Sequence, residues 1–322
     1  MDINAGTISA LNTRVNLAFN KWLKTADPTY NKISMTVGSS SGANFYPRLM
    51  ELKGMREWLG ERVVQAVSTQ ERFTIVNRTF EETFSVKRED FEDDQYGFLQ
   101  PIISQLGLDA GSLPDKLVYG LLNNGRTQKG IDGQNYFDTD HPSTNQDGQP
   151  ISWSNLMLPD TSQGEAPGPA WFLFCTKQPL KPMVFQRRRP FTVTPRTSLN
   201  TGEVFHHNEF VWGIDGRCAA GYGMHRCALM SVAPLNGPNL DKAYTQMQMQ
   251  FRADGTPYET CPDLLVVPPG LRATARKLLN SEVALLPQLA PDGKTWVTGA
   301  NEWKGQLEMV CSAYLRNDAA KI

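Results

Sequence analysis

The stretch "SLPDKLVYGLLNNG", residues 112–125, carries the clearest helical pattern in the middle of the chain. Its apolar side chains recur every three or four positions, which is typical of one face of a helix. They are Leu113, Leu117, Val118, Leu121 and Leu122. Pro114 falls in the first turn and Gly125 follows the last, where these residues are favoured at helix boundaries. The stretch therefore predicts a helix capped by Ser112.

A second helical pattern precedes it. The segment "REDFEDD", residues 88–94, concentrates carboxylates, which favour the partially positive start of a helix, and apolar residues continue the pattern to Leu106. The spacing of an Asp-x-Asp-x-Asp-Gly calcium loop is missing. Because Gly107 and Gly111 separate the two patterns, we expect one long spine over 88–124, broken near 107–111.

The N-terminal third predicts elements that need a partner surface. Apolar residues at three-to-four spacing between Ile8 and Trp22 indicate an amphipathic helix. Between Phe73 and Val86 apolar and charged residues alternate, as in half-exposed strands. We interpret these strands as a thin hairpin arm, which is marginal alone in water and needs a surface to lie against.

The remainder divides into two patterns. Residues 126–235 are rich in strands and loops, and the run Arg187–Arg189 suggests an edge strand or a contact between subunits. The last third predicts a compact α/β unit, with helices near 240–251 and 268–281 and strands at 263–267 and 305–315.

Composition excludes several classes of protein. The 322 residues carry a net charge of −1, so the chain lacks the basic surface with which proteins grip DNA. Its five cysteines are odd in number and widely spaced, which argues against a disulfide framework or a structural zinc site and fits a reducing compartment. No apolar run reaches the length of about 18 residues that a membrane helix requires.

The segment "YFDTDHPS", residues 136–143, is the strongest candidate for chemistry. Asp138, Asp140 and His141 are all types that bind metals, but a metal needs three or four ligands that converge in space. The same letters suit a turn, in which aspartates bond the nearby backbone and proline fixes φ. We therefore expect a turn here and no metal site.

Other catalytic motifs are absent or incomplete. "GYGMHR", residues 221–226, lacks the third glycine of a dinucleotide fingerprint, and neither G-x-S-x-G nor a phosphate loop occurs. Nothing near His225 and Cys227 in the sequence orients an imidazole for nucleophilic catalysis. We expect no enzyme, no catalytic residue and no cofactor.

The order of these segments, more than any single one, resembles the major head (capsid) subunit of Mu-like tailed phages. The resemblance covers nearly the whole chain, and its most specific pieces keep their order and spacing. They are "REDFEDD" (88–94), "PDKLVYGLLNNG" (114–125), "DGQNYFDTDHP" (132–142), "RCAAGYGMHRCA" (217–228) and "LLVVPPGLRATARKLLNSE" (264–282).

The resemblance implies the α+β Hong Kong 97-type capsid fold. Its parts would be an N-terminal arm (1–30), an extended hairpin loop (31–87), the broken spine helix (88–124), a mainly peripheral domain (125–235), a mainly axial domain (236–315) and a C-terminal tail (316–322). The arm and the hairpin would be stabilised by neighbouring copies. No long scaffolding segment would precede the arm.

By the same resemblance, the chain would assemble into hexamers and pentamers of an icosahedral shell that encloses double-stranded DNA without binding it specifically. Its partners would be a scaffolding protein, a maturation protease, a portal and a decoration protein, with assembly in the bacterial cytoplasm and no membrane. Charged residues in the loop are candidates for pairing between subunits: Arg56, Glu57, Glu61, Arg62, Glu71, Arg72 and Arg78. The alternatives are a metal-dependent enzyme using Asp138, Asp140 and His141, or a tail-tube or decoration protein.

Overall fold

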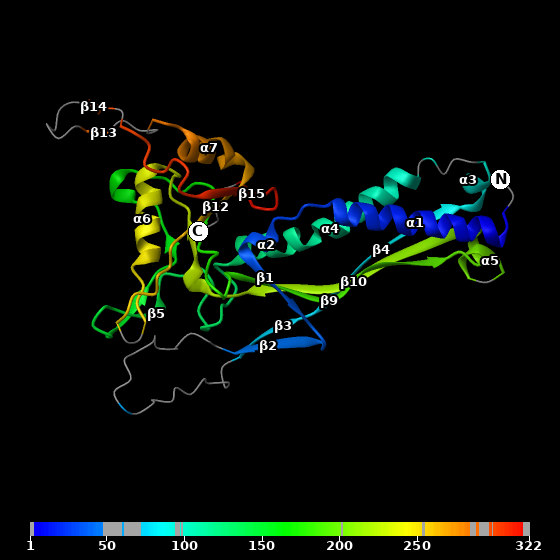
Figure 1. Cartoon of the computed structure of the whole chain (residues 1–322), viewed down its shortest axis with the longest axis horizontal. Coiled ribbons are helices and arrows are strands. Elements are labelled where there is room, and N and C mark those ends of the chain that lie inside the picture. Colours follow the sequence, from blue (N-terminus) through cyan, green and yellow to red (C-terminus); the bar gives the residue numbers. More distant parts are fainter. Residues whose placement is uncertain are drawn as a thin grey trace.

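The computed structural model describes residues 3–47, 60, 72–93, 97, 99–200, 202–252, 255–283, 288–289, 296–297 and 299–317. Two parts are evident in Figure 1: a compact lobe, and an elongated body that extends from it and ends near the N-terminus. No helix in the described residues combines the length and apolar character needed to cross a bilayer.

The elongated body is built on a four-stranded sheet. Its order is β1 (Ser34–Gly38), β9 (Met183–Arg196), β10 (Glu209–Tyr222) and β4 (Arg78–Lys87). The long strands β9 and β10 are antiparallel, and β1 is parallel to β9. Short helices α3 (Arg88–Glu92) and α5 (Glu203–His207) lie at the far end of the body. Side chains on β10 are alternately buried and half-buried over most of its length, so one face of the sheet carries the core.

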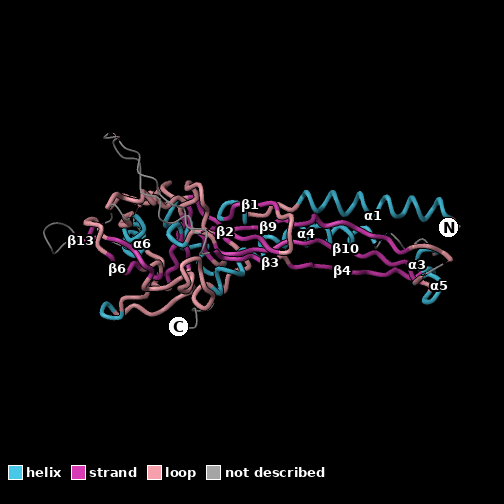
Figure 2. The backbone as a smooth tube through the Cα atoms, turned by 90° about the horizontal axis from the view of Figure 1, so that it is seen from below, coloured by secondary structure: helices cyan, strands magenta, loops and turns pink. Residues whose placement is uncertain are grey.

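Helices α1 (Ala5–Thr25) and α4 (Leu99–Asn124) lie side by side along this sheet (Figure 2). A capping box between Asn4 and Thr7 starts α1, and five of its apolar side chains are buried. They pack in one cluster with Phe210, Trp212 and Ile214 of β10. The predicted amphipathic helix is thus confirmed. The expectation that neighbouring copies stabilise the arm is wrong for α1, because its apolar face is covered by its own chain.

The predicted break in the spine is also wrong, because α4 runs through Gly107, Gly111 and Pro114 without interruption. A Cβ atom at Gly107 would lie 2.6 Å from the Phe19 carbonyl oxygen, and one at Gly111 only 2.4 Å from Ala26 Cβ. The glycines therefore mark the close approach of α1. The helix expected from residue 88 is divided instead, with α3 ending at Glu92 and α4 beginning at Leu99.

Strands β2 (Ala43–Pro47) and β3 (Arg72–Val76) form the hairpin that projects from the body in Figure 1. The two strands predicted between Phe73 and Val86 exist as β3 and β4, but they do not pair with each other. β3 pairs with β2, and β4 is the edge strand next to β10. The extended loop is therefore shorter than 31–87, because β1 and β4 belong to the main sheet.

Gln186 on β9 anchors the base of this hairpin. Its buried amide accepts a hydrogen bond from Tyr46 Oη at 3.0 Å and donates to Asn77 Oδ1 at 2.7 Å and to the Ile75 carbonyl at 3.2 Å. We predict that Gln186→Leu destabilises the chain by about 1–2 kcal/mol, because these buried groups lose their partner. Urea denaturation of Gln186→Leu against the wild-type chain measures the effect. An unchanged midpoint in Gln186→Leu would contradict it.

A five-stranded sheet forms the compact lobe. Its order is β15 (Glu308–Cys311), β12 (Leu264–Val267), β8 (Trp171–Phe174), β11 (Ala228–Ser231) and β7 (Leu156–Met157). Helices α6 (Gly237–Gln248) and α7 (Arg272–Asn280) pack on one face, and the end of α4 packs on the other. Smaller elements are α2 (Tyr30–Ile33), the β5–β6 hairpin (His141–Thr144, Pro150–Trp153) and the β13–β14 pair (Gln288–Leu289, Trp296–Val297).

The predicted helices and strands of the last third are confirmed within a few residues. However, β8 and β12 are neighbours, so a division at residue 235 runs through a single sheet. The run Arg187–Arg189 lies on β9, which is an inner strand where β1 pairs with it and has only β10 beside it after Arg187. Arg189 forms an ion pair with Asp215 of β10.

Candidate functional site

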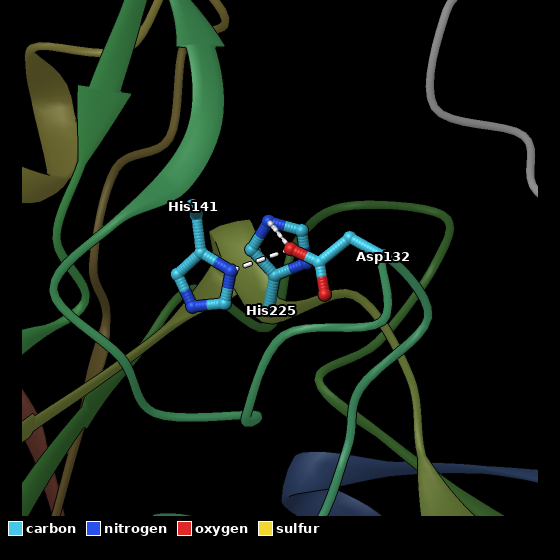
Figure 3. A group of neighbouring side chains, drawn as sticks. All are labelled: Asp132, His141 and His225. Atoms are coloured by element: carbon cyan, nitrogen blue, oxygen red, sulfur yellow. Dashed lines mark hydrogen bonds and ion pairs between the residues drawn. The ribbon is translucent and has the colours of Figure 1, made fainter.

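Three ionisable side chains converge inside the compact lobe: Asp132, His141 and His225 (Figure 3). Asp132 lies in the loop after α4, His141 begins β5, and His225 begins a short turn after β10. The side chains of Asp132 and His141 are 0% exposed and that of His225 is 1% exposed. The structure thus buries a carboxylate and two imidazoles that the sequence keeps far apart.

The loop that carries Asp132 is held by its own backbone. Gly130 N–H donates to the Gln134 carbonyl at 2.7 Å, and Tyr136 N–H donates to the Gln128 carbonyl at 2.9 Å. Gln134 N–H donates to Asp132 Oδ1 at 3.3 Å. This tight loop leaves the second carboxylate oxygen, Oδ2, to face the histidines.

Asp132 Oδ2 is the centre of the group. It lies 2.5 Å from His141 Nδ1 and 3.8 Å from His225 Nε2. The two imidazole rings are stacked, with centroids 4.2 Å apart and an interplanar angle of 12°. Both ring nitrogens therefore point toward the same oxygen, as Figure 3 shows.

Asn155 fixes the far side of His141. His141 Nε2 lies 3.0 Å from Asn155 Oδ1, which also accepts from Asp138 N–H at 2.9 Å. The Asn155 amide nitrogen donates to the Tyr136 carbonyl at 2.8 Å. This hydrogen bond and the one from Asp138 N–H require the same orientation of the Asn155 amide. Asn155 therefore presents an acceptor, and His141 Nε2 must carry a proton.

The second ring nitrogen of His141, Nδ1, faces the carboxylate of Asp132. Burial raises the pKa of Asp132, but the hydrogen bond with His141 and the charges of His225 and His141 outweigh it and lower the pKa to about 2. Asp132 is therefore ionised at neutral pH. At 2.5 Å, His141 Nδ1 and the Asp132 carboxylate oxygen are within hydrogen-bonding distance.

Of the three residues considered for a metal-dependent enzyme site, the structure places only His141 in the cluster. Asp138 is half-buried and accepts from Thr139 N–H at 2.8 Å, as in a turn, and Asp140 is exposed. Neither belongs to the cluster, so the alternative enzyme site of Asp138, Asp140 and His141 does not form. His206 and His207 lie on α5 at the opposite end of the elongated body.

Two members of the cluster, Asp132 and His225, were not predicted as its members. Asp132 lies in the stretch 132–142, and His225 has no second histidine at the helical spacing of metal ligands. Sequence spacing contained no signal that joins them, because a loop after α4 and a turn after β10 meet only in the folded chain.

Two of the seven candidates for pairing between subunits lie among the described residues. Arg78 is exposed at the start of β4, and Arg72 lies in β3, where only its backbone is described. The other five, Arg56, Glu57, Glu61, Arg62 and Glu71, lie outside the described residues.

The burial of the cluster limits its chemistry. A general acid or base must come within hydrogen-bonding distance of its substrate. Asp132, His141 and His225 have almost no exposed surface, so a substrate from solvent does not reach them. The geometry favours a structural role.

Comparisons with known proteins give a consistent result. A sequence model of the family "Mu-like prophage major head subunit gpT" matches residues 8–315. The major capsid protein of Escherichia phage Mu is 37% identical over 319 residues, which cover 98% of this chain and 100% of that protein.

Two solved structures of bacteriophage JBD30 are also similar. A chain of its procapsid matches with a TM-score of 0.79 and 34% identity, over 97% of this chain and 100% of that one. A chain of its capsid decorated with minor capsid protein trimers matches with a TM-score of 0.69 and 25% identity, over 89% and 91%.

Proposed function

The chain belongs to the family of Mu-like prophage major head subunits, and from this premise we propose that its copies form the pentamers and hexamers of an icosahedral shell around double-stranded DNA. It is a structural capsid protein with the α+β fold of Hong Kong 97-type capsids. The observation that carries the proposal is the match to the JBD30 procapsid chain, which extends over the elongated body, the hairpin and the compact lobe alike.

The shape of the subunit supports assembly through many contacts. The elongated body presents β4 as an edge strand whose side chains are mostly exposed, and it includes Glu81 and Glu82. Charged edges resist indiscriminate pairing but still allow pairing with a complementary neighbour. Such an extended subunit distributes its contacts over several neighbours rather than concentrating them in one hydrophobic interface.

The charge of the chain supports enclosure of DNA without tight binding. The 32 basic residues are balanced by 33 acidic ones. Each phosphate that a protein neutralises adds salt-dependent affinity. A subunit with a net charge near zero would let DNA move during packaging.

We assign the elongated body to the peripheral domain and the compact lobe to the axial domain, with α4 as the spine that joins them. A scaffolding protein, a maturation protease, a portal and a decoration protein complete the proposed assembly, which takes place in the bacterial cytoplasm. The likeness to a chain of a capsid decorated with minor capsid protein trimers supports one of these partners, the decoration protein, and the likeness to a procapsid chain supports assembly through a precursor shell.

The hairpin allows a direct test of the proposed function. Pro47 and Arg72 are paired residues of β2 and β3, so Asn-Gly can replace residues 48–71 and close the hairpin with a tight turn. We predict that this variant folds but forms no closed shells, because the extended loop supplies contacts to neighbouring copies.

Electron microscopy after co-expression with the scaffolding protein measures the outcome, with the wild-type chain as the reference. Circular dichroism and size-exclusion chromatography establish that the variant is folded. Normal shells from the shortened chain would remove the proposed role of the loop. Failure of the wild-type chain to form shells would contradict the proposed function itself.

A further inference from the structure

We propose that Asp132, His141 and His225 form a binding site for one divalent transition-metal ion, with zinc as the best match to its ligands. One carboxylate and two imidazoles are a donor set that zinc commonly takes. The proposed assembly function assigns no role to any residue of the set. The site would serve as an internal clamp.

The separations between the donor atoms fit a metal after a small adjustment. The three ligand atoms all lie within 4.8 Å of one another. Zinc binds nitrogen and oxygen at about 2.0–2.2 Å, which places tetrahedral donor atoms about 3.4 Å apart. Asp132 Oδ2 is now 2.5 Å from His141 Nδ1 and 3.8 Å from His225 Nε2, so one separation must widen and the other must shorten slightly.

The hydrogen bonds of His141 support the same assignment. Its Nε2–H donates to Asn155 Oδ1, which leaves Nδ1 as the nitrogen that faces Asp132. Histidines that bind metals usually donate their other N–H to a carbonyl or carboxylate oxygen, and this fixes the tautomer and the ring orientation. A metal ion bound by Nδ1 and Oδ2 would replace the present hydrogen bond between these two atoms, and His141 would be a neutral ligand.

Binding requires two movements. The stacked rings must splay, because a metal ion lies in the plane of each imidazole that binds it, and the Asp132 carboxylate must withdraw by about 1 Å from His141. Asp132 lies on a loop rather than on a helix or strand, so this shift does not disturb the sheet. A water molecule would take the fourth position, as in other sites with three protein ligands.

The location of the site indicates which segments of the chain the metal ion would hold together. Asp132 follows the end of α4 at Asn124, and His225 follows the end of β10 at Tyr222. These are two of the long elements that lead from the elongated body into the compact lobe, and His141 begins the β5–β6 hairpin of that lobe. One ion would join all three segments at the junction between the two parts.

Titration of the purified full-length chain with Co²⁺, after removal of metals with a chelator, tests the proposal. We expect one equivalent of Co²⁺ to bind, with the visible absorption bands of a four-coordinate nitrogen and oxygen site, and one equivalent of Zn²⁺ to displace it. His225→Gln and His141→Gln should each weaken the affinity at least about 10- to 100-fold. Asp140→Asn and His206→Gln are matched controls with the same types of side chain outside the cluster, and they should bind like the wild type.

Three results would overturn the proposal. The first is a wild-type chain that binds neither Co²⁺ nor Zn²⁺. The second is binding that the His225 and His141 variants retain in full, which would place the metal elsewhere. The third is nitrogen NMR of the wild-type chain with added Zn²⁺ that still shows a proton on both ring nitrogens of His141. Because the decisive measurement uses the wild-type chain, it does not depend on the folding of a variant, and it is independent of shell formation.

Discussion

Replacing Asp132 with alanine is expected to lower the free energy of unfolding by about 3–5 kcal/mol when the chain is measured in the presence of a chelator. The side chains of Asp132 and His141 are both 0% exposed, and their closest atoms are 2.5 Å apart. Removing the carboxylate leaves His141 Nδ1 buried without its acceptor. Losing one partner of a buried ionic pair costs much more than losing both.

Urea denaturation followed by circular dichroism measures this effect. Asp140→Ala serves as the control, because Asp140 is exposed nearby, and it should change the stability by no more than about 0.5 kcal/mol. The double variant Asp132→Ala, His141→Leu should be less destabilised than the sum of the two single variants. Additive effects would show that the two side chains do not act as a pair.

Local patterns were sufficient to predict many elements of the fold. The spacing of Ile8, Leu11 and Val15 predicted α1, and the apolar run at 264–267 predicted β12, because each of these signals lies within one element. Pairing was predicted less well. β3 and β4 are consecutive in sequence, but one pairs with β2 and the other with β10, and the alternation of their residues contains no information about partners.

The partners within the candidate site could be predicted from the sequence even less well than the pairing of the strands. His141 was recognised because it stands beside two aspartates, but these neighbours are not its partners. Its contacts are Asp132, Asn155 and His225, which come from three other loops or turns. Loops have no periodic pattern from which burial can be inferred, so only the folded chain reveals that these side chains meet.

Gly107 and Gly111 gave the clearest wrong prediction, because glycine has two meanings in a helical pattern. It lowers helix stability by about 1 kcal/mol relative to alanine, and it also removes the side chain that would keep a second helix away. The residues that settle the question, Phe19, Leu23 and Ala26, belong to α1 and the segment after it. A sequence read along one helix does not identify the other helix.

Alanine at these glycines is therefore expected to reverse the usual effect on a helix. Gly107→Ala and Gly111→Ala should each destabilise the chain by about 1–3 kcal/mol, because the new methyl groups would meet backbone and Cβ atoms of the N-terminal segment at 2.4–2.9 Å. Gly120→Ala lies in the same helix with no atom within 4 Å of the added Cβ, and it should stabilise the chain by up to about 1 kcal/mol.

Because the expected changes in stability have opposite signs, the variants distinguish the effect of packing against α1 from the effect of helix propensity. Thermal and urea denaturation of the three variants give the order of stability, and hydrogen exchange of α1 amides shows whether the helix has lifted from α4. The double variant Gly107→Ala, Gly111→Ala should increase exchange throughout α1, because Phe19 and its neighbours lose their packing against Trp212 and Phe210. Stabilisation by all three alanines would mean that α1 does not rest on α4 at this distance, and that the glycines are only weak points in the helix.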